Sequence, residues 1–227
     1  MKLGGQNTGN GLHISSGGSL TDYYLSPEVV GDSVEADSLK RAAEIARGIQ
    51  TIFSREDEQH YRRIRKGLNA LLRGIREGDD AAFRLHQFVR AVEAVIKPDA
   101  GRTTKQFVHR SAFLAGRTNN DRALMRMLFE MRSAAEHLNP LSDLINEHNA
   151  HERNKLIALR VFQAEILAGY LYCRLLTDLD LLQDFSTDEN ISAFWAGRDD
   201  ELIQTWGRPI DLEGSIEWKF DMYLSRR

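Results

Sequence analysis

The feature that most constrains this fold is a helical pattern over residues 153–184 that is apolar around most of its circumference. A helix of this kind on its own would expose much of its apolar surface to water, so other helices must cover it from several sides. The pattern predicts a helix in the middle of a bundle, or in a bundle that dimerises. The apolar positions are Leu156, Leu159, Val161, Phe162, Ile166, Leu167, Tyr170, Leu171, Leu175, Leu176, Leu179 and Leu182.

Earlier stretches of the chain supply the helices that this core helix needs. Apolar periodicity and capping residues predict helices over residues 38–53, 55–77, 81–97, 103–116 and 119–138. In the first of them, Leu39, Ala42, Ala43, Ala46, Ile49 and Phe53 are expected to face inward. Four prolines and little β-branched alternation agree with a mostly α-helical chain. The predicted fold class is therefore an all-α helical bundle.

The 227 residues are enough for one substantial domain with extensions. We predict a flexible Gly/Ser-rich arm over 1–37, a helical bundle over 38–184 and an aromatic-rich extension over 185–227. The spaced glycines of the arm match no phosphate-binding loop pattern. The tryptophans of the extension either pack back over the bundle or form an interaction surface, and packing is the favoured interpretation.

Composition excludes several classes of protein. A single cysteine, Cys173, allows neither a disulfide nor a cysteine metal site within one chain. No uninterrupted apolar run reaches the roughly 20 residues that span a bilayer, and the first residues lack a signal-peptide core. We therefore expect a soluble, cytoplasmic protein that does not associate with a membrane.

Charge is distributed unevenly along the chain, whose net charge is −3. Residues 1–140 carry 21 basic and 17 acidic residues, whereas residues 141–227 carry 9 and 16. The most cationic segment, 102–132, has seven basic residues against two acids, and a basic surface of this kind attracts phosphate. Helix 55–77 is also rich in arginine, but a solvated basic face is its ordinary explanation. We predict RNA contacts at Arg102, Lys105, Arg110, Arg126 and Asn139.

A possible site lies where the helix over 119–138 ends. Pro140 biases Asn139 away from helical dihedrals, which places His137 at the helix C-terminus. Arg132 precedes His137 by five positions, about 140° of rotation on a straight helix, so the two do not share a face automatically. Either Arg132 pairs with Glu136 four residues on and His137 caps the helix, or the arginine and the imidazole converge on one site.

The order of helices over 79–184, with Arg132, Ser133 and His137 at the end of one of them, resembles the HEPN superfamily of small all-α proteins. The matching pattern is Arg, a polar residue, a short spacer and His; many members carry Gly after the His, where this chain has Leu138. The resemblance implies a metal-independent endoribonuclease that works as a homodimer, with two motifs in one cleft, and a role as a toxin or in antiviral defence. Other members are non-catalytic modules for protein–protein or nucleotide binding.

The residues at this helix end suit RNA cleavage, because RNA supplies its own nucleophile in the 2′-OH. His137 would transfer the proton, Arg132 would stabilise charge on the phosphate, Ser133 and Asn139 would position it, and Glu136 would orient the imidazole. This chemistry needs no metal and no cofactor.

Two alternatives remain open. Glu147, His148, His151 and Glu152 are metal-ligand types, but their spacing is not that of a zinc motif, and a polar turn is the favoured interpretation. The second alternative is that the chain is a non-catalytic module, which binds a protein partner through the aromatic extension.

Overall fold

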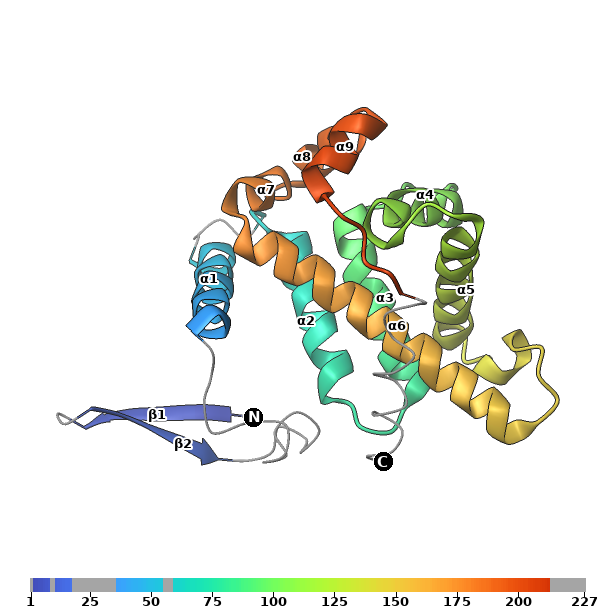
Figure 1. The fold of residues 1–227 in the computed structure, drawn as a ribbon, viewed down its shortest axis with the longest axis horizontal. Helices are drawn as coiled ribbons and strands as arrows, with labels where there is room; N and C mark the ends of the chain where they lie inside the picture. The colour runs from blue at the N-terminus through green and yellow to red at the C-terminus, as the bar shows by residue number, and fades with distance from the viewer. Residues whose placement is uncertain (1, 9–10, 18–35, 55–58, 213–227) are drawn as a thin grey trace.

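The computed structural model describes residues 2–8, 11–17, 36–54 and 59–212, shown in Figure 1. Residues 36–212 form the all-α bundle that the sequence predicts. Its helices are α1 (Ala36–Phe53), α2 (Arg62–Arg76), α3 (Ala81–Ile96), α4 (Thr103–Ala115), α5 (Asn119–Glu136), α6 (Ala150–Thr177), α7 (Leu179–Asp184), α8 (Asp188–Trp195) and α9 (Asp199–Trp206), with a short 3₁₀ turn, η1 (Leu141–Leu144), between α5 and α6.

The N-terminal region contains an antiparallel hairpin that the sequence analysis did not predict. Strand β1 (Lys2–Thr8) pairs with β2 (Gly11–Gly17), with Lys2 opposite Gly17 and Thr8 opposite Gly11. The glycine-rich sequence has no sustained apolar alternation, so it gives no strand signal. The rest of the arm predicted over 1–37, residues 18–35, lies outside the described residues.

Helix α6 is the central helix, as its apolar pattern predicts. It packs against α3, α1 and α2, and it crosses α2 and α3 diagonally in Figure 1. By length and composition alone α6 would pass for a membrane-spanning helix, but half of its most apolar window is buried inside the protein. Its position is that of the core helix of the bundle. The helix ends at Thr177 and not at 184, because Asp178 leaves helical dihedrals and caps α7 by accepting from the Leu181 amide.

Two other helices differ from prediction. Helix α2 begins at Arg62, since Tyr61 is in the left-handed conformation at φ 53° and interrupts any helix from residue 55. The stripe of α1 expected to face inward is partly or largely exposed: Leu39 is 59% and Phe53 is 51% exposed. Helix α1 lies at the edge of the bundle, and only Gly48 and Ile52 are buried. All six residues expected to face inward are exposed, so the predicted face was wrong. The buried face of α1 carries Ile45, Gly48 and Ile52, because the missing side chain of Gly48 lets α1 approach Leu176 of α6 closely.

The described part of the C-terminal extension, residues 185–212, packs on the bundle, which agrees with the favoured interpretation. Trp195 and Trp206 are buried and stack with ring centroids 6.1 Å apart. The Trp195 indole donates a hydrogen bond to the Val95 carbonyl at 3.0 Å. Phe185 and Phe194 pack beside Trp206, whereas Trp218, Phe220 and Tyr223 lie outside the described residues.

Candidate anion-binding site

Helix α5 starts and stops where its sequence predicts. Thr118 and Asp121 form a reciprocal capping box at its start. At its end the Asn139 amide donates to the Ala134 carbonyl and the Leu138 amide to the Ala135 carbonyl, which is a Schellman motif. This motif requires the left-handed conformation at Leu138, whose φ is 58°. A leucine therefore occupies a position that favours glycine.

The side chain of Arg132 turns back from this end toward α3. Its Nε lies 3.1 Å from Glu93 Oε2, and its Nη1 pairs with Glu136 one turn further along α5. The side chains of Arg132 and Glu93 are only 17% and 16% exposed. The Arg132–Glu136 pair, one of the two alternatives that the sequence left open, is thus present.

His137 is placed differently. It is the C-cap of α5 and is exposed, as are Leu138 and Asn139. No hydrogen bond or ion pair joins its side chain to another residue in the described part of the chain. Ser133 is half-buried on α5. Within one chain, then, Arg132 faces α3 while the His137 ring lies at the open end of the helix.

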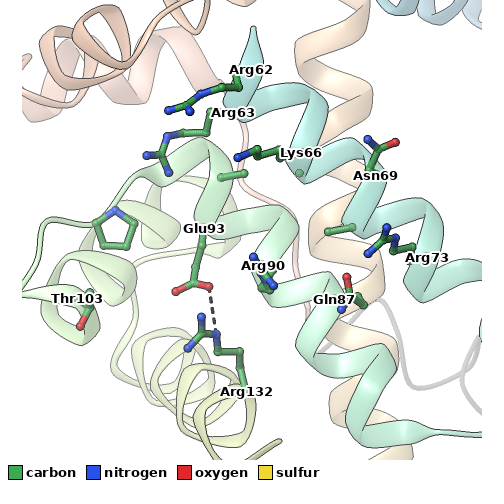
Figure 2. Close-up of a pocket in the computed structure, with 14 residues that line it drawn as sticks. Arg62, Arg63, Lys66, Asn69, Arg73, Gln87, Arg90, Glu93, Thr103 and Arg132 are labelled. Atoms are coloured by element: carbon green, nitrogen blue, oxygen red, sulfur yellow. Dashed lines mark ion pairs between the residues drawn. The ribbon is translucent and has the colours of Figure 1, made fainter. Parts of the chain in front are cut away.

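Arg132 forms part of the wall of a pocket of about 600 Å³ between α2, α3 and α5. Figure 2 shows its side chains, most of them on these three helices and Thr103 at the start of α4, with the Glu93–Arg132 ion pair at one side. We call it the cationic pocket, because one carboxylate, Glu93, faces six basic side chains: Arg62, Arg63, Lys66, Arg73, Arg90 and Arg132. The other lining residues are small or uncharged, and none of them is aromatic.

Helix periodicity gathers the basic residues of α2 on one side. Arg62, Lys66 and Arg73 are spaced by four and seven positions, so they follow one face of the helix. Ile64, Leu68 and Leu71 bury the neighbouring face in the core, which fixes the rotation of α2. The row from residue 62 to residue 73 spans about 16 Å at 1.5 Å per residue.

The basic residues differ in how far they are already neutralised. Arg63 pairs with Asp188 at 3.0 Å, and Arg132 with its two glutamates. The side chains of Arg62, Lys66, Arg73 and Arg90 form no hydrogen bond or ion pair with any residue that the structure describes, and all four are exposed. These four cations are available to an anionic ligand.

Burial and the positive charges of Arg132 and Arg90 shift the pKa values of two titratable groups on α3. Burial raises the pKa of the Glu93 carboxyl, although Arg132 and Arg90 pull it the other way. Burial also lowers the pKa of His86, and the positive charges of Arg132 and Arg90 lower it further. The His86 Nε2 atom is buried without a hydrogen-bond partner among the described residues. His86 therefore lies close to Arg132, a proximity that the sequence gave no means to anticipate.

None of the five residues predicted to contact RNA lines the pocket. Arg110 donates to the carbonyls of Ile96 and Lys97 at 2.7 and 2.6 Å and lies over the Trp195 ring, so it ties the end of α3 to α4. Arg102, Lys105 and Arg126 are exposed, and like Asn139 they do not line the pocket. The sequence analysis gave α2 the ordinary explanation of a solvated face. The periodic row of cations on α2 was the signal that could have identified the pocket.

The polar turn before α6 acts as a helix cap. Asn149 Oδ1 accepts from the amides of His151 and Glu152, and Glu147 accepts from the Asn149 amide at 2.8 Å. Among the described residues, no group of three or more His, Cys, Asp or Glu side chains is arranged to hold a metal ion.

Comparison of the chain with family models, with curated proteins and with solved structures finds no match in any of the three. The HEPN resemblance thus rests on the motif at the end of α5 and on the order of the helices.

Proposed function

We propose that this protein binds RNA and that the cationic pocket holds the sugar–phosphate backbone. The observation that carries the proposal is the concentration of six basic side chains around one carboxylate, in a chain whose net charge is −3. An acidic protein repels a polyanion over most of its surface, so attraction is confined to the part where basic residues gather. Arginine suits phosphate because its planar donors bind two oxygens at once.

The lining of the pocket also indicates how RNA would be recognised. Stacking of bases on aromatic side chains supports many single-stranded RNA sites, and the pocket lining contains no aromatic residue. Phosphate contacts position a nucleic acid without reading its sequence. The expected binding is therefore sensitive to salt and tolerant of sequence.

Cleavage of the bound RNA is the second part of the proposal. Arg132 lines the pocket, and the imidazole of His137 is exposed one residue beyond α5. In a homodimer of the HEPN kind, His137 of one copy would serve as the acid–base group for a phosphate held by Arg132 of the other, without a metal. Such an endoribonuclease would act in the cytoplasm as a toxin or in antiviral defence.

A non-catalytic helical module is the alternative. Trp195 and Trp206 are buried in the bundle, so these two residues offer no surface to a partner protein. A non-catalytic module would then bind a partner protein through the aromatic residues beyond 212. Alternatively, it would bind a nucleotide in the cationic pocket.

Binding is tested by fluorescence anisotropy with a labelled single-stranded RNA of about 12 nucleotides, within the usual range of site sizes. The Lys66→Ala/Arg90→Ala variant should bind about tenfold or more weakly and show a smaller salt slope, since each lost phosphate contact reduces that slope by about one. Lys40→Ala/Arg47→Ala, on exposed positions of α1, removes the same charge far from the pocket and should bind like wild type.

The same measurement compares the pocket with the segment predicted from sequence. Arg102→Ala/Arg126→Ala removes two exposed cations that do not line the pocket. A loss of affinity equal to that of the Lys66/Arg90 variant would place the RNA elsewhere, and absence of saturable binding by wild type at low salt would refute the function.

Cleavage is tested with mixed RNA in the presence of EDTA, using wild type, Arg132→Ala and His137→Ala. Wild type should cleave and both variants should lose most of the activity. Equal cleavage by all three would exclude the catalytic assignment. Binding without any cleavage by wild type would leave the non-catalytic module.

A further inference from the structure

Among the residues that the structure describes, Glu93 is the one acidic residue in the wall of the cationic pocket. Its carboxylate lies 3.1 Å from Arg132 Nε, with both side chains largely buried. Figure 2 shows the pair between α3 and α5, beside the basic residues of α2. An anion that enters at this wall therefore meets an arginine whose positive charge is already balanced.

The surroundings of Glu93 are charged on every side. His86 and Arg90 precede it on α3 at seven and three positions, so they lie near one face of that helix. Arg132 and Glu136 face it from α5, and both affect its ionisation, as does Arg90. From α2 the pocket adds Arg62, Arg63, Lys66 and Arg73.

We propose that Glu93 is an internal counter-ion that competes with a ligand phosphate for Arg132, and thereby sets the affinity of the cationic pocket. The inference rests on the proposed function, because it takes the phosphate of RNA as the competing anion. Glu136 is a weaker competitor, since its side chain is 45% exposed and water screens its charge.

The competition follows from the donors of Arg132. A guanidinium has five N–H groups in a fixed plane, and the glutamates face Nε and Nη1. A phosphate that takes two donors at once must share the cation with Glu93 or displace it. A carboxylate that loses its arginine in a largely buried place is stabilised by taking up a proton.

Binding is therefore coupled to proton uptake. Burial already raises the pKa of Glu93, so it accepts a proton at a higher pH than an exposed glutamate does. His86 acts in the same direction: its pKa is lowered in the free protein, and a phosphate beside it would favour the protonated imidazolium. RNA affinity should rise as pH falls below neutrality, with Glu93 and His86 both contributing.

The test measures RNA affinity by anisotropy from about pH 5 to 8, the range over which a perturbed carboxyl and an imidazole titrate. At pH 8 Glu93→Gln should bind RNA about tenfold more tightly than wild type, which corresponds to about 1.4 kcal/mol. The affinity of this variant should also depend less on pH. Glu130→Gln, an exposed carboxylate on α5 outside the pocket, is the matched control and should behave as wild type. His86→Gln should keep the part of the pH dependence that belongs to Glu93.

A second measurement needs no variant. Calorimetric titration of wild type with RNA in buffers of different ionisation enthalpy reports protons taken up on binding, and net uptake near neutral pH is expected. Binding by wild type without proton uptake, or Glu93→Gln with unchanged affinity and pH profile, overturns the role of Glu93 and leaves RNA binding intact. Absence of RNA binding at every pH overturns the proposed function itself.

Discussion

A buried ion pair gives the clearest prediction about the stability of the bundle. Arg84 Nη2 lies 2.8 Å from Glu165 Oε2, and the two side chains are only 8% and 10% exposed. Arg84 Nε also donates to the Gly74 carbonyl at 3.3 Å, so this residue of α3 contacts both α2 and α6. Arg84→Met keeps the aliphatic volume and removes the cation from a carboxylate that stays inside the protein.

The expected cost follows from that burial. Breaking a buried pair by removing one partner destabilises a protein by about 3–5 kcal/mol, because the remaining charge is desolvated. For a chain of this size about 1 kcal/mol corresponds to roughly 2–4 °C in Tm, so the Tm should fall by roughly 6–20 °C. The double variant Arg84→Met/Glu165→Leu removes both charges and should recover most of the loss.

Urea unfolding followed by circular dichroism measures these free energies, and wild type, Arg84→Met, Glu165→Leu and the double variant form a double-mutant cycle. Lys155→Met is the control: its Nζ lies 3.1 Å from Glu152 Oε1 and both side chains are more than two fifths exposed, so loss of this pair should cost less than about 1 kcal/mol. The reasoning is refuted if Arg84→Met costs no more than this control, or if the double variant is as unstable as the single one.

Three further predictions concern backbone strain, close packing and pH. Leu138→Gly should stabilise the protein by about 1 kcal/mol in urea unfolding, because a 93% exposed leucine loses no packing while its left-handed strain is relieved; a lower stability would contradict this. Gly48→Ala should lower the Tm, because a Cβ there would lie 2.2 Å from the Leu176 carbonyl oxygen and force α1 away from α6. This cost should exceed the roughly 1 kcal/mol by which alanine favours a helix over glycine. An unchanged Tm would contradict the close packing of α1 on α6. The folded-state pKa of His86 is below its ordinary 6.5, so as pH falls the unfolded chain binds the proton first. The contribution of His86 to stability is therefore lost as pH falls from 6.5 through the folded value. NMR titration of the ring measures the direction of the pKa shift, and His86→Gln should lack this pH-dependent loss of stability.

The helices were largely predictable because their signals are local. The range of α3 was predicted to within one residue, since Asp80 caps its start and apolar residues recur along it. The end of α5 followed from Pro140. The break at Asp178 was missed, because apolar residues continue on both sides of it and outweighed a single capping aspartate.

The pocket was less predictable because it depends on how helices pack. Periodicity places Arg62, Lys66 and Arg73 on one side of α2, but it does not tell whether that side faces water alone or an adjacent wall on α3. The contact between Glu93 and Arg132 joins helices that are separated by all of α4. The motif at the end of α5 drew attention to Arg132, which lines the pocket, while its partner Glu93 had no sequence signal.

Helix α8 connects the walls of the pocket. Lys97, just after α3, donates to the Asp188 carbonyl and to Ser192 Oγ, both at 2.6 Å, and Arg63 of α2 pairs with the Asp188 side chain. Truncation of the chain at residue 185 would therefore remove α8 and its contacts to both walls. Loss of ligand binding in such a fragment would show that the walls had lost their support. Conversely, a macromolecule that bound the outer surface of α8 would separate those walls. The C-terminal region would then control ligand binding from a distance, without contacting the ligand.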